Sequence, residues 1–536
     1  MTNLLVGVQG AEPYGKVFFL TFSMSIGGIE RMLSKVHSGA VMGIESIPIL
    51  VEVNTGLPGE PRFITVGLPD MAVKESHDRV SSALMNNGFL MPKTRTVVNL
   101  SPGNLRKEGP IYDLPIALGV IKSTGQANLP DLSDFIIAGE LSLSGELLPI
   151  AGCIALAMQA RKYHKKLILP KISAETAAFV HDIEIFSANS LCEMVQFLSH
   201  EIALPKVNME FTADRMQNHF DVDFSEVKGQ KALRRAVEVA VAGGHNLLMV
   251  GTPGSGKSMI AKRIPTIMPT PTLEEFLEIL SIYSSCQRVN SIGEVKRPFR
   301  APHHTISDVG LLGGGSYPIP GEISLAHNGV LFLDELPEFR RSTLEVLRQP
   351  LEDGFIAISR SAAKVQFPCS FMLIAAMNPC PCGFLGDSKR ECLCSPGQIQ
   401  RYRSKISGPL LDRIDLHIDV RPIDTSELRQ QQSMEDSAAI RERIIRVREI
   451  QKQRKQVNNF TNAKMNQEDL KKYCSLSETC ELLLTSAIDT LALSARAHDR
   501  ILKVARTIAD LESTENISEN HLLEAIHYRS LDRKLF

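Results

Sequence analysis

A glycine-rich turn that ends in a lysine and a serine has the clearest chemistry in the sequence: Gly251, Thr252, Pro253, Gly254, Ser255, Gly256, Lys257 and Ser258. Glycines let backbone N–H groups turn toward phosphate oxygens, the lysine brings a positive charge to the terminal phosphates, and the serine hydroxyl can ligate Mg²⁺. The apolar segment 247–250 predicts a buried strand before the turn, and the residues after Ser258 predict a helix. This order of elements predicts a site for a nucleotide triphosphate with Mg²⁺.

Three polar residues follow two further apolar segments that predict strands. Asp334 and Glu335 come directly after residues 330–333, and Asn378 comes after residues 372–377. Beside a phosphate loop, we expect the Asp334 carboxylate to organise Mg²⁺ and the Glu335 carboxylate to orient the attacking water. The Asn378 amide can hydrogen-bond the γ-phosphate or that water, although Asn before Pro379 is by itself only a turn signal. The set predicts hydrolysis of the nucleotide.

Four of the ten cysteines, Cys380, Cys382, Cys392 and Cys394, stand within fifteen positions. Four thiolates can complete a tetrahedral Zn²⁺ shell, so the cluster predicts a structural zinc site. Pairs separated by one residue are less usual in zinc sites than pairs separated by two, which leaves redox-active thiols and unligated reduced cysteines as alternatives. His303 and His304 could also bind a metal, but we expect them in a hydrogen-bonded turn beside the nucleotide site.

Length and composition bound the class of protein. The 536 residues exceed what one hydrophobic core holds, so about three domains are expected. The 59 Lys and Arg residues balance 60 Asp and Glu residues, so a polyanion must be bound by local patches rather than by a global positive field. No apolar run is long enough to span a bilayer, and the cysteines suit a reducing compartment, which predicts a cytoplasmic protein without a membrane partner.

The periodicity of apolar residues predicts the domain organisation. Residues 1–40 are interpreted as a leader without the features of a signal peptide, and Met32 offers an alternative start. Residues 41–203 predict an α+β domain, with strands at 49–53 and 95–100 and helices at 71–85 and 114–121. Residues 204–223 are polar and predict a linker. Residues 224–424 predict the α/β phosphate-loop core, which includes the cysteine cluster at 380–394, and residues 425–536 predict a helical lid.

The α+β domain resembles the proteolytic domain of Lon-type proteases in segment 138–150, in the helix after it and in residues 167–170. The resemblance implies a ribosomal S5 domain 2-like fold. Proteolysis of this kind needs a serine activated by a lysine, and this sequence has Ile111 and Ile154 at those two places. We therefore interpret the domain as a non-proteolytic scaffold or interaction module, and an ATP-dependent protease is disfavoured.

The phosphate loop, Asp334 with Glu335, Asn378 and segment 408–416 together resemble an AAA+ ATPase of the magnesium-chelatase-like group. With a Lon-like domain in front, the chain resembles the YifB/ComM family after about residue 40, including segments 300–304, 351–354 and 528–533. The resemblance implies an α/β AAA+ core with a helical lid, which assembles into a homo-oligomeric ring such as a hexamer and holds ATP and Mg²⁺ at subunit interfaces. ComM proteins are understood as DNA branch-migration helicases in natural transformation, so single-stranded or branched DNA is the implied partner.

The resemblance also assigns roles to two arginines. Arg413 matches the arginine finger that reaches into a neighbouring subunit's ATP and stabilises charge in the transition state. A salt bridge to an adjacent aspartate is the alternative for Arg413. Arg496 matches the second sensor on the lid, and Arg500 and Arg506 are close enough in sequence to compete for that role.

Two segments resemble pore elements that contact a translocating strand: the glycine-rich insertion 307–321 and an expected hairpin at 355–367 with Arg360 and Lys364 near its tip. A flexible surface loop without a ligand is the alternative. The basic helix expected at 440–455 is interpreted as a solvated face, with DNA contact as the second interpretation. The leading function is a ring-forming ATPase that moves along DNA. The alternative is a chelatase-like or chaperone-like ATPase that remodels a protein partner without nucleic acid.

Overall fold

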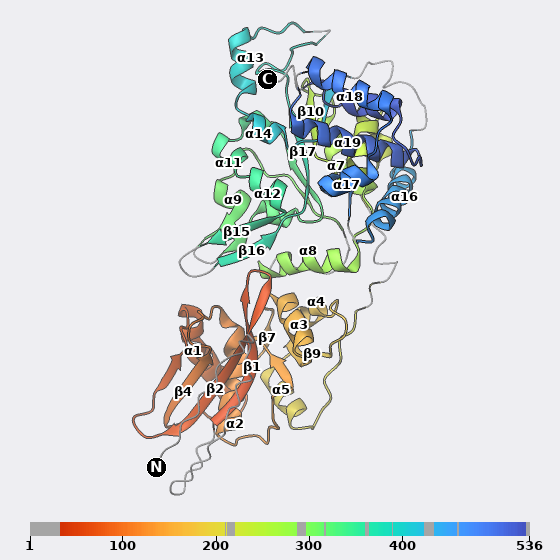
Figure 1. Ribbon diagram of the computed structural model, residues 1–536. Helices are drawn as coiled ribbons and strands as arrows, with labels where there is room; N and C mark the ends of the chain where they lie inside the picture. Colours follow the sequence, from red (N-terminus) through yellow and green to blue (C-terminus); the bar gives the residue numbers. More distant parts are fainter. Residues whose placement is uncertain are drawn as a thin grey trace, which may run out of the picture.

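Figure 1 shows the computed structural model of the protein. The structure describes residues 33–209, 211, 220–286, 296–315, 318–359, 364–387, 390–422, 434–457, 460–491 and 493–531. Residues 1–32 of the expected leader lie outside these ranges. Within the described ranges, a first domain is followed by a phosphate-loop core and a helical lid.

The first domain is built on a seven-stranded mixed sheet with the strand order β3-β4-β2-β1-β5-β8-β9. Its elements are β1 (Leu33–Met42), β2 (Glu45–Leu57), β3 (Phe63–Val66), α1 (Met71–Asn86), β4 (Arg95–Ser101), η1 (Pro110–Tyr112), α2 (Asp113–Ser123), β5 (Phe135–Ile137), β6 (Glu140–Leu141), β7 (Leu147–Leu148), α3 (Cys153–Lys162), β8 (Lys166–Pro170), α4 (Lys171–Ala177), β9 (Ile185–Ala188) and α5 (Leu191–Leu198). Alternate residues of β2 are buried, as a strand with one covered face requires. The strands and helices expected at 49–53, 71–85, 95–100 and 114–121 are confirmed.

The expected start of this domain at residue 41 is wrong, because β1 already runs from Leu33. The buried positions of the strand include Ser34, Val36, Ser38 and Ala40. Two serines among these four inward positions hide the apolar alternation that signals a strand. The Ser34 hydroxyl is accommodated inside because it donates to the Gly119 carbonyl at 2.7 Å.

The expected linker at 204–223 is also wrong at its start. The Val207 N–H donates to the Ile185 carbonyl at 2.9 Å, so this segment extends the edge of the sheet next to β9. Val207, Met209 and Phe211 then pack against the hydrophobic core of the first domain. Their spacing of two residues is a strand signal that the surrounding polar residues obscure.

The phosphate-loop core contains a five-stranded parallel sheet with the order β11-β14-β17-β10-β18. These strands are β10 (Leu247–Gly251), β11 (Phe299–Arg300), β14 (Val330–Leu333), β17 (Met372–Met377) and β18 (Leu416–Val420). Strands β10, β14 and β17 are buried at every position, as parallel strands covered on both faces require. Because they run parallel, their carboxyl ends bring the phosphate loop, the acidic pair and Asn378 to one edge of the sheet. The expected α/β fold of the core is confirmed.

The helices and smaller elements of the core surround this sheet. They are η2 (Phe224–Glu226), α6 (Lys231–Gly243), α7 (Lys257–Ile267), α8 (Leu273–Ser285), α9 (Asp308–Leu312), β12 (Gly313–Gly314), β13 (Ile319–Pro320), α10 (Glu322–Leu325), η3 (Leu336–Glu338), α11 (Arg341–Glu345), α12 (Arg348–Asp353), β15 (Phe355–Ser359), β16 (Lys364–Pro368), α13 (Pro396–Arg403) and α14 (Gly408–Leu411). Strands β15 and β16 form the expected antiparallel hairpin. Arg360 and the side chain of Lys364 lie outside the described part of the chain.

The glycine-rich insertion contacts this hairpin. It holds helix α9 and the small antiparallel pair β12 and β13. A Cβ added to Gly313 would lie 3.2 Å from Cδ1 of Ile358, so β12 lies directly against β15. The two expected pore elements are therefore neighbours in the fold.

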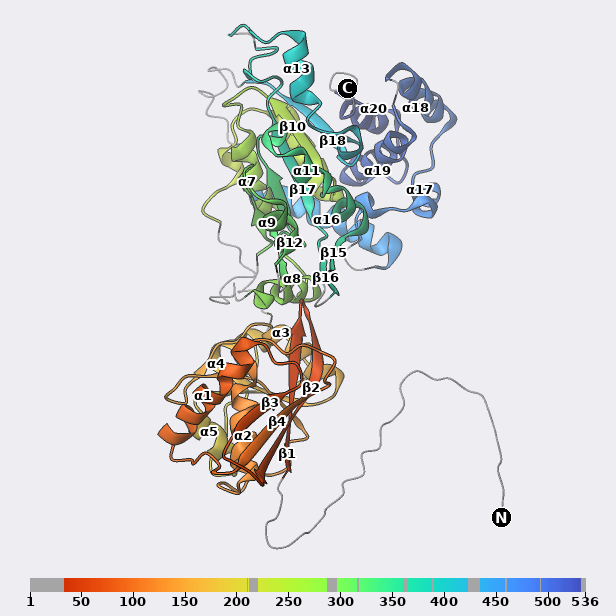
Figure 2. The ribbon, with the colours of Figure 1, turned by 90° about the vertical axis from the view of Figure 1, so that its left-hand side faces the viewer.

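The lid consists of α16 (Ser437–Lys455), η4 (Asn462–Lys464), α17 (Gln467–Tyr473), α18 (Glu478–Leu491), α19 (Ala495–Leu511) and α20 (Glu519–His527). Figure 2 shows α18, α19 and α20 grouped beside the core and clear of the first domain. Residues of these helices share one hydrophobic core with α6, α7 and the parallel sheet. Burial of the apolar stripe of α19 is what fixes the lid to the core.

The solvated basic face expected on α16 is wrong for most of its basic side chains, and only Arg446 and Lys452 among them are exposed. Arg454 forms an ion pair with Asp510 of α19, and Lys455 forms one with Asp469 of α17. A guanidinium nitrogen of Arg448 donates to the Val241 carbonyl of α6 at 2.7 Å. The long basic side chains reach across to neighbouring elements because α16 is packed between the core and the lid.

Helix α8 joins the core to the first domain, and Figures 1 and 2 both show it between them. Phe276 and Leu280 of α8 belong to the hydrophobic core of the first domain, where the Phe276 ring meets Phe179 edge-on at 5.2 Å. The Gly152 N–H donates to the Ser284 carbonyl at 2.9 Å. Among the described residues, no helix is long and apolar enough to cross a membrane.

Candidate nucleotide site and cysteine cluster

The phosphate loop connects β10 to α7, and its conformation depends on two glycines. Gly254 and Gly256 have φ angles of 77° and 91°, which are left-handed values that favour glycine. Lys257 begins α7, and its Nζ donates to the carbonyls of Gly251 at 2.6 Å and Thr252 at 2.9 Å. Burial lowers the pKa of Lys257, and the nearby carboxylates of Asp334 and Glu335 oppose that shift.

The residues expected to hold Mg²⁺ are in direct contact. The Ser258 hydroxyl donates to Oδ2 of Asp334 at 2.6 Å, and Oδ1 of Asp334 accepts the Glu335 N–H at 2.9 Å. A hydroxyl and a carboxylate held together beside the phosphate loop fit the oxygen ligands that Mg²⁺ takes in nucleotide sites. The donor set therefore suits the ion, with the phosphate oxygens of the nucleotide as its further ligands.

Glu335 stands in a strained backbone conformation at the end of β14. Its φ is 52° although it is not a glycine, a conformation that clusters at functional sites. Its side chain is 55% exposed, and Oε2 lies 3.5 Å from Nδ1 of His304. His303 Nδ1 lies 2.9 Å from the Thr305 hydroxyl, and the His303 carbonyl accepts the Ile306 N–H at 3.0 Å, so His303 stands in the expected hydrogen-bonded turn.

Asn378 lies at the end of β17, with its Oδ1 3.4 Å from Nζ of Lys257. The structure thus brings together Lys257, Ser258, Asp334, Glu335 and Asn378 from three neighbouring strands. Sequence reasoning missed Gln230, whose Nε2 donates to the Arg421 carbonyl at 2.6 Å and to the Ser255 carbonyl at 3.4 Å. Its only signal in the sequence is its place before the helix that leads to the phosphate-loop strand.

Arg413 follows α14, and its carbonyl accepts a hydrogen bond from the Asn246 amide at 3.0 Å, at the opposite end of β10 from the phosphate loop. One guanidinium nitrogen forms an ion pair with Glu352 of α12, and another donates to the Pro409 carbonyl at 2.6 Å. The bond from Arg413 lowers the pKa of Glu352, and the positive charges of Arg496 and Arg348 lower it further. The partner of Arg413 is therefore Glu352 and not an adjacent aspartate, and Arg496 of the lid comes close to the same carboxylate.

The two competitors of Arg496 have other partners. Arg500 forms an ion pair with the buried Asp415. Arg506 is buried and donates to Asp510 at 3.0 Å. Arg496, by contrast, is exposed on the first turn of α19. Arg348, Glu352 and Arg413 line part of a surface cleft of about 580 Å³.

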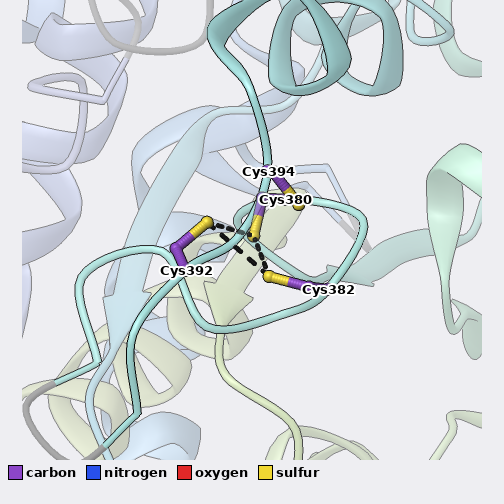
Figure 3. Close-up of side chains that lie close together, drawn as sticks. All are labelled: Cys380, Cys382, Cys392 and Cys394. Atoms are coloured by element: carbon purple, nitrogen blue, oxygen red, sulfur yellow. Dashed lines mark hydrogen bonds between the residues drawn. The ribbon is translucent and has the colours of Figure 1, made fainter.

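The four cysteines lie close together, as Figure 3 shows. All four sulfurs lie within 4.8 Å of one another, and the Cys380 sulfur lies 3.3 Å from that of Cys382 and 3.6 Å from that of Cys392. A hydrogen bond from the Phe384 backbone lowers the pKa of the Cys382 thiol to about 6. All ten cysteines are free thiols. The expected cluster is thus formed, and its donor set suits a thiophilic metal ion.

Comparison with known proteins agrees with this geometry. Residues 223–428 match the family described as magnesium chelatase, subunit ChlI, residues 51–173 match the family described as subunit ChlI of Mg-chelatase, and residues 434–529 match the ChlI C-terminal family. The chain is 44% identical to the competence protein ComM of Haemophilus influenzae over 508 residues, which cover 94% of this chain and 98% of ComM. It is 41% identical to the protein YifB of Escherichia coli over 512 residues, with the same coverage. The chain belongs to the YifB/ComM family.

Membership of this family fixes the broad class of the site. The match over residues 223–428 spans the phosphate loop, the acidic pair, Asn378, the cysteine cluster and Arg413, and the match over residues 434–529 spans Arg496. The core is therefore a magnesium-chelatase-like AAA+ domain, a class of ATPases that use ATP and Mg²⁺ and assemble into oligomers. The match over residues 51–173 includes Ile111 and Ile154, which are both buried in the first hydrophobic core.

Proposed function

We propose that the protein hydrolyses ATP at the edge of the parallel sheet. The observation that carries this proposal is the contact of Lys257, Ser258, Asp334 and Asn378 around one phosphate loop, with Glu335 facing solvent beside them. Lys257 and the loop N–H groups bind the phosphates, and Ser258 and Asp334 hold Mg²⁺. Glu335 orients and deprotonates the attacking water, and Asn378 fixes the γ-phosphate or that water. The adjacent cysteines are proposed to bind zinc.

Two arginines are proposed to complete the site from a neighbouring subunit. Arg413 pairs with Glu352, and its backbone contacts Asn246 at the opposite end of β10 from the phosphate loop. Arg496 lies near the same carboxylate, and this placement supports a contribution across an interface. In a ring, most simply a hexamer, Arg413 would leave its ion pair with Glu352 and contact the ATP of the neighbouring subunit. An isolated subunit then lacks its full catalytic set.

The proposed work of the ring is movement along DNA in the cytoplasm, as in a branch-migration helicase of natural transformation or recombination. The similarity to a competence protein over nearly its whole length supports this role. The neighbouring insertion and hairpin are proposed to contact the strand in the pore. A chelatase-like or chaperone-like motor that remodels a protein remains the second candidate, because the chelatase family matches run across all three parts of the chain.

The ATPase rate with and without DNA separates the two candidates. Single-stranded and branched DNA should each shift the protein in a gel and raise its ATPase rate. ATP hydrolysis that no DNA stimulates, together with no gel shift at low salt, would favour remodelling of a protein. Degradation of casein in the presence of ATP would instead support an ATP-dependent protease, the function that Ile111 and Ile154 disfavour.

A further inference from the structure

The spacing of the four cysteine sulfurs fits one tetrahedral metal ion. A zinc ion with Zn–S bonds of about 2.3 Å separates its ligand sulfurs by about 3.8 Å. The closest sulfurs are 3.3 to 3.6 Å apart, and Cys394 completes the set within 4.8 Å. Small shifts of the side chains therefore suffice to bind the ion, and all four positions lie on two short segments of the core.

The loop that carries the first two cysteines rests on the nucleotide site. Gly383 has a φ of 85°, and a Cβ added to it would lie 2.7 Å from the ring of Pro253 in the phosphate loop. No side chain other than hydrogen fits there without moving one of the two loops. The cysteine loop therefore packs directly against the phosphate loop.

The same loop continues directly from Asn378. Cys380 comes two residues after Asn378, and the intervening Pro379 carbonyl accepts a hydrogen bond from the Arg403 guanidinium of α13 at 3.1 Å. The Tyr402 hydroxyl, also on α13, interacts with the backbone of Asn378. Helix α13, which contacts Pro379 and Asn378, begins just after Cys394 and so directly follows the second cysteine pair.

We infer that Cys380, Cys382, Cys392 and Cys394 bind one zinc ion, and that this ion clamps the 380–386 loop and α13 against the phosphate loop. This inference rests on the ATPase proposed above and adds a metal requirement to it. With zinc bound, Asn378 and Pro253 are held in place from one side. Without zinc, the four buried or half-buried cysteine sulfurs lose the metal ion that joins them, and the loop loses the crosslink that positions it.

Metal analysis tests the site itself. Protein purified without chelator should contain about one zinc per chain, and Cys380→Ser with Cys382→Ser should lose it. Because that variant risks misfolding, zinc should also be removed from the parent protein with a zinc-selective chelator in excess Mg²⁺ and then restored. A protein that carries no zinc, or whose cysteines form disulfides under reducing conditions, would overturn the inference.

Nucleotide measurements on the same samples test the clamp. Zinc removal should lower kcat/KM for ATP by about 10- to 100-fold, since small displacements of catalytic groups have effects of that size. Zinc addition should restore the rate. Equal rates with and without zinc would overturn the clamp and leave the ATPase intact. A zinc-loaded parent that hydrolyses no ATP would contradict the ATPase proposal alone, and the ATP affinity with and without zinc would then decide the clamp.

A matched glycine pair separates the clamp from general damage to the loop. Gly383→Ala and Gly386→Ala introduce the same backbone strain, because the φ angles are 85° and 81°. Only the first meets the phosphate loop, since a Cβ on Gly386 would find nothing within 4 Å. Both variants should keep their zinc. Gly383→Ala should lower kcat/KM for ATP while Gly386→Ala leaves it near the parent value, and equal effects of the two would contradict the clamp.

Discussion

The nucleotide site and the first domain each bury a lysine, and the two lysines have different neighbours. Lys257 donates to carbonyls of its own loop but also lies 3.4 Å from Asn378, beside the carboxylates of Asp334 and Glu335. Lys107 is fully buried, and its Nζ donates to the carbonyls of Pro102 and Leu105, two residues of its own loop. Burial lowers the pKa of both. A buried cation therefore marks a site only where groups from other elements converge on it.

The same contrast separates the candidate catalytic residues of the core from the corresponding places in the first domain. At the carboxyl ends of β10, β14 and β17, polar side chains meet around an open loop. At Ile111 and Ile154, apolar side chains fill a closed core, with exposures of 7% and 0%. The first domain contacts the core through α8, and the residues proposed for catalysis lie in the core.

The largest effect is expected for Arg413→Ala, which tests whether the polar groups of one subunit suffice. The variant should bind ATP with nearly the parent affinity but lose about 10³- to 10⁵-fold in turnover, because the guanidinium is proposed to act on a neighbour's ATP. Mixed with Lys257→Ala, it should regain activity, since an intact loop then meets an intact arginine. Rings that form from the mixture and stay inactive would argue against a residue supplied in trans.

Glu335→Gln should have the next largest effect. The amide keeps the shape of the side chain but cannot accept a proton, so turnover should fall by about 10²- to 10⁴-fold while ATP binding is retained. Lys257→Ala should lose ATP binding itself. Binding is measured with a fluorescent ATP analogue and turnover by phosphate release. Parent-like turnover of Glu335→Gln would remove this residue from the mechanism.

Lys107→Met is expected to have a smaller effect, on stability rather than on turnover. It tests whether the two buried lysines have different roles. The Pro102 and Leu105 carbonyls would lose a donor, so the free energy of unfolding should fall by about 1 to 3 kcal/mol. ATP affinity and kcat of the folded protein should stay at parent values. Denaturant unfolding and ATPase rates check the two parts. A folded Lys107→Met protein that no longer binds ATP would show that the comparison of the two lysines is mistaken.

The site and the fold were predictable from the sequence to different extents. Segments 247–250, 330–333 and 372–377 are uninterrupted aliphatic runs, so the strands and the polar residues after them could be placed in order. Parallel pairing then predicts that those residues meet. β1 could not be placed, because buried serines replace aliphatic residues at its inward positions.

Contacts between distant segments also could not be predicted from the sequence. Arg413 and its partner Glu352 are 61 residues apart, and neither is marked by a local pattern that names the other. The approach of Gly383 to Pro253 depends on how two loops pack over the same sheet edge. The basic run of α16 looked solvated because composition does not reveal which charges find partners across a helix interface.

The smallest effect is expected for Lys364→Ala on the β15–β16 hairpin, which asks whether DNA contact belongs to the core insertions or to the lid. A near-neutral chain must concentrate its phosphate contacts, and for single strands log affinity falls with log salt by about 0.7 per phosphate neutralised. Lys364→Ala should flatten that slope and weaken the stimulation of the ATPase by DNA. The basal rate should survive, because Lys364 is neither among the groups at the sheet edge nor the partner of Arg413, which is Glu352.

Lys452→Ala on α16 is the matched control for this change. Lys452 is an exposed cation of the same type on α16, where Arg454 and Lys455 are paired with neighbouring elements and Arg446 is also exposed. It should leave both the salt slope and the stimulation by DNA unchanged, so that the difference between the two variants reports position rather than net charge. If Lys452→Ala abolishes DNA binding and Lys364→Ala has no effect, the strand runs over the lid, because a threaded strand would meet the hairpin first.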